Sequence, residues 1–130
     1  MGQISNYLRA TRDRYREDLV ENILPFWLQH GLDRKHGGIY TCVDRDGTLM
    51  DTTKSVWFQG RFAFVASFAY NQIEQRPEWL EAARTTIEFI ERHCFDTDGR
   101  MFFEVTEDGC VDAAMSSVRA SLPSPSASTP

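Results

Sequence analysis

The chain has 130 residues, of which 42% are hydrophobic and 25% charged, so it has room for one folded domain and is not disordered throughout. Its net charge of -5 provides no cationic surface for nucleic acid, and no apolar run reaches the roughly 18 residues of a membrane span. The N-terminus lacks a signal-peptide core, and the three cysteines form no C-x-x-C pair, so we expect free thiols in a cytoplasmic protein.

The first predicted element is a helix over residues 5–30. Its apolar residues recur in steps near four and form a single stripe, so we expect an amphipathic outer helix that Pro25 kinks or divides. The chain then changes character. A β-prone run at residues 39–43 and the turn signal Asp46-Gly47 predict a short two-stranded excursion.

The second predicted helix spans residues 52–73, with Asp51, Thr52 or Thr53 as its cap. Apolar side chains surround it on nearly every side, and such a helix has to be covered on every side. We therefore expect an inner helix of a layered structure. Lys54 falls in its first turn under this assignment, where we expect a solvated surface lysine, with a functional position as the alternative.

The third predicted helix begins at Arg76-Pro77, since proline is favoured in a first turn, and it is amphipathic again. Asp98-Gly99 then turns the chain into a short strand, residues 101–105, and Asp108-Gly109 turns it once more. Outer and inner helices thus alternate in an all-α arrangement. Two amphipathic helices do not shield one inner helix, so the pattern requires more helices than it supplies.

Two stretches of the chain carry a family resemblance, residues 24–64 and residues 76–109. The most specific piece is K-S-V-W-F-Q-G-R, from Lys54 to Arg61. Both stretches resemble the N-terminal part of the N-acylglucosamine 2-epimerase family, which includes cellobiose 2-epimerases and other sugar isomerases. The resemblance implies an (α/α)6 barrel, of which residues 1–109 would form the N-terminal part, with about three helices and two short β-hairpin excursions.

Residues 110–130 form a tail rich in Ala, Ser and Pro that we expect to be disordered. The alternative hypothesis is that the tail is not the natural continuation of the domain. Read one base earlier, allowed codons for residues 110–125 can encode LRRCRYVFSESFAAIA, which resembles the next helix of the family. A frameshift near Gly109, leaving a truncated epimerase domain over residues 1–109, is therefore our expectation.

Four residues are candidate sugar contacts: Arg61, Trp57, Gln59 and Tyr40. Arg61 stands in an otherwise apolar helix, its donors suit sugar hydroxyls, and the family places a substrate-contacting arginine at this motif position. The alternative for Arg61 is a buried structural ion pair. Trp57 lies one turn earlier on the same helix face and either stacks on a sugar or packs in a core. Gln59 and Tyr40 have equally plain packing alternatives.

The resemblance implies C2 epimerisation of an N-acylhexosamine or a related aldose by proton abstraction and return. Two histidines of the family carry those roles, and we expect them in helices beyond this chain. His30 and His93 are expected to cap helices or to lie at the surface, and His36 is expected in a loop beside Gly37-Gly38. We therefore expect a catalytically inactive chain with no catalytic residue, no cofactor and no metal site.

The expected partner is a small-molecule sugar, and a homodimer stays open. Two alternatives remain. The chain could be a non-catalytic interaction module that docks through an exposed apolar helix face. It could also be another (α/α)6 enzyme such as a glycoside hydrolase, for which Asp44, Asp46 and Asp51 are carboxylate candidates by type, although turn and capping roles explain them better.

Overall fold

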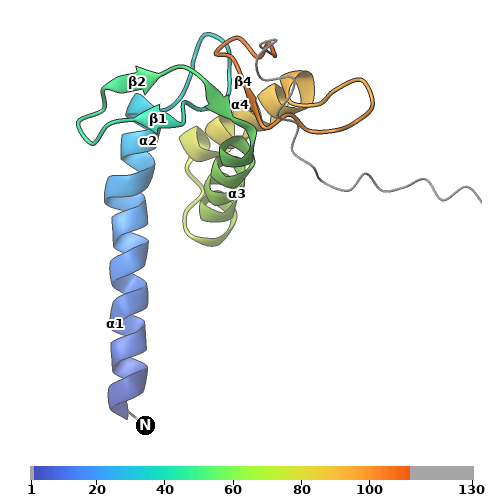
Figure 1. Cartoon of the computed structure of the whole chain (residues 1–130). Coiled ribbons are helices and arrows are strands. Elements are labelled where there is room, and N and C mark those ends of the chain that lie inside the picture. The colour runs from blue at the N-terminus through green and yellow to red at the C-terminus, as the bar shows by residue number, and fades with distance from the viewer. Residues whose placement is uncertain (1, 112–130) are drawn as a thin grey trace, which may run out of the picture.

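The computed structural model describes residues 2–111, and its elements follow one another in the predicted order (Figure 1). The helices are α1 (Gly2–Asp18), α2 (Leu24–His30), α3 (Val56–Gln72) and α4 (Pro77–His93), and the strands are β1 (Cys42–Val43), β2 (Leu49–Asp51), β3 (Lys54–Ser55) and β4 (Glu104–Val105). Of the predicted tail, residues 112–130 lie outside the described residues. None of the described helices combines the length and apolar character that crossing a bilayer requires.

The first predicted helix is divided, as Pro25 predicts. A π-helical turn, η1 (Leu19–Ile23), separates α1 from α2 directly before the proline. Proline has no backbone N–H, and its ring clashes with the carbonyl four residues earlier, which falls inside this turn. Helix α1 buries none of its residues and extends away from the rest of the molecule (Figure 1). Arg16 reaches across to the body and donates to the Ile73 carbonyl at 3.2 Å.

The core lies where α3 packs side by side with α4, and α2 packs alongside them (Figure 1). Small side chains of α3, such as Ala66 and Ala69, are fully buried and let the helices approach closely. Trp79 and Leu24 fill the space beside Ala69.

The opposite side of α3 is open. Trp57, Phe64 and Phe68 are 65%, 69% and 49% exposed, although each is a large apolar residue. Phe64 and Phe68 stack on one another at 6.0 Å between ring centroids. The predicted inner helix is therefore apolar on both sides but covered on only one of them among the described residues.

The strands correct two expectations. Helix α3 begins at Val56, not at residue 52, because Lys54 and Ser55 form strand β3 and pair with Val105 and Glu104. The predicted hairpin β1–β2 is present. The second excursion is closed by the antiparallel bridge between Phe95 and Met101, and its strand β4 then pairs with β3 from the first excursion.

Each outer helix ends in the same small structure. In the first copy, the His30 ring contacts the Phe26 ring in a tilted arrangement, at 5.1 Å between centroids. Leu32 and Ile39 then form an isolated antiparallel bridge. The following turn places Gly47 against the His30 ring in a left-handed conformation, with φ of 90°.

The second copy follows α4. The His93 ring contacts the Phe89 ring in a tilted arrangement at 5.0 Å between centroids, Phe95 bridges Met101, and Gly109 lies against the His93 ring with φ of 85°. The two histidines that we expected as helix caps or surface groups therefore hold each outer helix to the turn that follows it.

A glycine comparison tests this packing. Gly47→Ala forces an alanine into the left-handed region and places its methyl group in the His30 ring, whereas Gly99→Ala, with φ of 83°, meets open space. We expect Gly99→Ala to cost about 1–2 kcal/mol of unfolding free energy from backbone strain alone. Gly47→Ala should cost clearly more in the same denaturant titration, and equal costs would contradict the packing of His30 on this turn.

Candidate functional site

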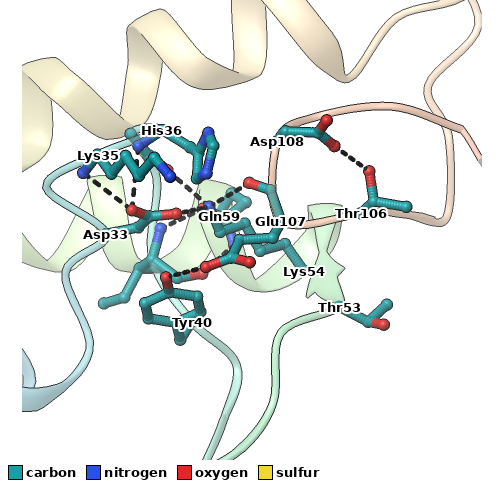
Figure 2. A network of polar contacts seen from close by, with 12 residues as sticks. Asp33, Lys35, His36, Tyr40, Thr53, Lys54, Gln59, Thr106, Glu107 and Asp108 are labelled. Atoms are coloured by element: carbon teal, nitrogen blue, oxygen red, sulfur yellow. Dashed lines mark hydrogen bonds and ion pairs between the residues drawn. The ribbon is translucent and has the colours of Figure 1, made fainter.

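A fully buried lysine of strand β3 lies at the centre of a network of polar contacts (Figure 2). The Lys54 ammonium is 0% exposed and donates to Asp33 Oδ2 at 2.6 Å, to the Gly37 carbonyl at 2.9 Å and to the Glu107 carbonyl at 2.7 Å. These bonds use all three of its donors. We call Lys54, Asp33, Gly37, Glu107 and Tyr40 the Lys54 network. The expectation of a solvated Lys54 is wrong, because β3 turns its side chain inward against Asp33.

Electrostatics favour the ionised pair. Burial raises the pKa of the Asp33 carboxyl, but hydrogen bonds from Lys54 and from the backbone N–H groups of His36 and Lys35 outweigh it and hold the pKa below its ordinary value. Burial lowers the pKa of Lys54, and the contact with Asp33 opposes that shift. The rings of Phe89 and Tyr40 lie 4.6 and 5.1 Å from the ammonium and add cation–π attraction.

Tyr40 and Gln59 lie in or beside this network. The Tyr40 hydroxyl donates to Glu107 Oε1 at 2.6 Å, and burial together with this acceptor raises the pKa of the phenol, which keeps it a donor. Gln59 is buried, and its side-chain amide accepts from the Ile39 N–H at 2.7 Å and donates to the Ile39 carbonyl at 2.6 Å. Gln59 thus fixes the loop before β1 to α3, and Tyr40 fixes the same loop to the turn after β4.

Three potential metal ligands also meet here. Ligand atoms of Asp33, His36 and Glu107 lie within 4.8 Å of one another. The Asp33 oxygens already accept from Lys54 and from backbone N–H groups, and Glu107 accepts from Tyr40. The ammonium of Lys54 thus supplies the positive charge that these carboxylates require, and the donor set does not fit a divalent cation.

Arg61 and Trp57 meet on the exposed side of α3. The Arg61 guanidinium lies 4.2 Å from the centre of the Trp57 ring, as expected for residues four apart on a helix. They line an open groove of about 520 Å³ together with Phe64 and Met101. We call these four residues the Trp57–Arg61 face. Among the groove residues, Arg61 carries the one ionisable side chain.

The structure therefore divides the four predicted sugar contacts into two pairs. Trp57 and Arg61 lie together on an accessible surface, and within residues 2–111 Arg61 is exposed and forms no ion pair. Tyr40 and Gln59 instead make hydrogen bonds within the fold, Tyr40 to Glu107 and Gln59 to the backbone of Ile39.

Sequence reasoning missed the inward side chain of Lys54 and its partners Asp33 and Glu107. The one signal was the spacing of Lys54 and Val56, which share a side of an extended segment. The three glycoside-hydrolase candidates have turn roles: Asp46 and Asp51 accept backbone N–H groups two residues on, and the Asp44 backbone closes the hairpin turn. They form no pair across a cleft.

Comparison with known sequences gives one consistent match. The model of the N-acylglucosamine 2-epimerase (GlcNAc 2-epimerase) family matches residues 37–118. N-acylglucosamine 2-epimerase of Bos taurus is 42% identical over 88 residues, which is 66% of this chain and 21% of that protein. The Mus musculus protein of the same name is 35% identical over 106 residues, 78% of this chain and 25% of its own length. The chain thus spans about a quarter of these relatives or less.

Comparison with solved structures agrees. The cellobiose 2-epimerase from Spirochaeta thermophila DSM 6192 superposes with a TM-score of 0.70 and 30% identity over 81% of this chain and 26% of its own. The cellobiose 2-epimerase from Bacillus thermoamylovorans B4167 gives 0.72 and 25%, over 80% and 27%. The described helices therefore resemble part of an (α/α)6-barrel sugar epimerase.

A double-variant comparison tests the Lys54 network. Lys54→Met removes the ammonium and leaves Asp33 buried without a counter-ion, which should lower the unfolding free energy by about 3–5 kcal/mol. In Asp33→Asn/Lys54→Met neither charge remains unpaired, so we expect a smaller loss. Denaturant unfolding at neutral pH measures both variants, and a double variant as unstable as the single one would contradict an ion pair.

The same pair predicts an acid sensitivity. Since the pKa of Asp33 is lowered in the fold, its carboxylate stabilises the protein above the ordinary carboxyl pKa of 3.8, and this stabilisation is lost as pH falls through the folded value. Between about pH 5 and about pH 2, the wild-type chain should lose more unfolding free energy than the Asp33→Asn/Lys54→Met variant. Parallel losses in the two proteins would assign the acid sensitivity to other carboxylates.

Proposed function

Because the chain belongs to the N-acylglucosamine 2-epimerase family, we propose that it forms one wall of the sugar-binding cavity of a carbohydrate 2-epimerase. The substrate of the whole enzyme is an N-acylglucosamine or a related aldose. The reaction removes the proton at C2 and returns it on the opposite face of the sugar. Within this reaction the chain binds and orients the sugar.

One observation carries the proposal: an arginine and a tryptophan lie together on an accessible helix face in a fold shared with sugar epimerases. The Arg61 guanidinium offers several N–H donors in a fixed plane, which suits adjacent hydroxyl groups and an enolate oxygen that develops charge. The Trp57 ring offers an apolar surface for the C–H face of a pyranose. Together they supply orientation and charge stabilisation.

The described residues supply no proton-transfer pair at this groove. His30 and His93 pack against the turn glycines at the ends of α2 and α4, and His36 lies beside Asp33. None of them lines the groove, whose walls are otherwise apolar. We therefore assign the acid and the base to later helices of the barrel, and the substrate contacts of Arg61 and Trp57 to this chain.

A titration tests the sugar contacts. N-acetylglucosamine added to the ¹⁵N-labelled chain should shift the Trp57 indole resonance, and Arg61→Ala should weaken the affinity at least about tenfold, as loss of a charge-assisted hydrogen bond predicts. Arg84→Ala on the exposed side of α4 is the matched control and should leave the affinity unchanged. Equal affinities for wild type and Arg61→Ala would overturn the proposal.

Activity gives a second test. The purified chain should not convert N-acetylglucosamine to its manno epimer, since the groove contains no acid–base pair, while N-acylglucosamine 2-epimerase of Bos taurus serves as the positive control. Deuterium exchange at C2 in heavy water, followed by proton NMR, measures the first half of the reaction on its own. Detectable exchange would contradict this division of roles.

A non-catalytic interaction module is the second candidate, favoured by the exposed, stacked pair Phe64 and Phe68. If this surface docks another protein copy, sedimentation should show a concentration-dependent dimer that Phe68→Asp dissociates. A chain that sediments as a monomer at all concentrations would count against it.

A further inference from the structure

The start of α3 is held from outside the helix. Ser55 occupies the N-cap position, but its side chain makes no capping hydrogen bond. The first N–H groups of a helix have no partner within the helix, so an uncapped first turn tends to fray. Here the Val56 N–H instead donates to the Phe103 carbonyl at 3.1 Å, in the strand segment that runs into β4.

Lys54 is the main external anchor. It precedes the first residue of α3 by two positions, and its ammonium bonds to three acceptors in two segments that are distant in sequence: Asp33 and Gly37 in one loop and Glu107 in the last turn (Figure 2). With every donor used and the Phe89 ring against it, the ammonium has one favourable position. The backbone of β3 is thereby fixed relative to both loops.

A second anchor lies one turn further. Gln59 binds the backbone N–H and carbonyl of Ile39, so the buried side of the first turn is tied to the same loop that Lys54 reaches through Gly37. Trp57 lies between these anchors in sequence but points to the exposed side, and Arg61 follows one turn later.

We propose that Lys54 is a positioning residue, which fixes the first turn of α3 and thereby places Trp57 beneath Arg61 on the sugar-binding face. The link to sugar binding rests on the proposed function. The placement of Trp57 by Lys54 does not depend on it. A methionine could fill the same volume, but it could not bridge the carboxylate and the two carbonyl groups. The ammonium is therefore required for placement as well as for packing.

The test reads the Trp57–Arg61 geometry directly in the full chain without sugar. A guanidinium 4.2 Å from an indole ring is shifted upfield by the ring current, so the Arg61 Nε–H resonance reports the contact. We expect Lys54→Met and Asp33→Asn/Lys54→Met to lose at least half of this upfield shift and to move the Trp57 indole resonance. Leu24→Ala, a core truncation at the other end of α3, should retain both signals despite its lower stability.

Wild-type resonances in a folded Lys54 variant would overturn the inference. If Lys54→Met does not fold, the double variant decides, since it leaves no unpaired charge. If neither folds, amide exchange of the wild-type chain decides: the Val56 and Ile39 N–H groups should exchange through one shared opening, and independent opening would refute the proposal.

Sugar affinity then separates the two proposals. If both hold, the double variant should bind N-acetylglucosamine roughly tenfold more weakly than wild type. If the wild-type chain binds no sugar while the Arg61 and Trp57 resonances still respond to Lys54, the proposed function fails and the positioning role stands.

Discussion

The central constraint on this structure is the buried ammonium group of Lys54, which needs a hydrogen-bond acceptor for each of its donors. Moving a charged lysine into a protein interior costs several kcal/mol, and the fold recovers this only by meeting every donor of Lys54 with an acceptor. The acceptors come from a loop near Asp33 and a turn near Glu107. Each segment alone is a short irregular stretch with few buried residues. The shared ammonium of Lys54 holds the two segments together.

Helix α3 links this layer to the proposed function. Its buried side carries small residues and Gln59, which pack against α4 and the loop before β1. Its other side carries large aromatic residues and Arg61 in the open. A helix with one side exposed to solvent normally carries polar residues on that side. The exposed aromatic side is consistent with a barrel in which further helices surround the same groove.

Local signals in the sequence predicted the helices, strands and turns. They did not predict the contacts between residues that are distant in sequence. Pro25 and Pro77 marked where helices divide and begin, and Asp-Gly pairs marked the turns, because these residues act through their own backbone. The spacing of Trp57 and Arg61 also predicted correctly that they share one face of the helix.

The pairing of β3 with β4 joins segments some fifty residues apart, and no periodicity within either strand indicates it. Lys54 was misjudged for the same reason. Without a known counter-ion, a lysine is predicted to be exposed to solvent. The sequence around Asp33 indicates only a turn and does not indicate that its carboxylate is buried.

The repeated ends of the outer helices bear on how such a chain could have grown. In both copies an aromatic–histidine ring contact, an isolated bridge and a glycine turn against the histidine ring lie within about twenty residues of sequence. The residues that form the structure at the end of each helix therefore follow that helix directly in the sequence. Tandem duplication of one such segment would add a helix together with its own stop and return, so an ancestral gene could lengthen by whole units without disturbing the junctions already present.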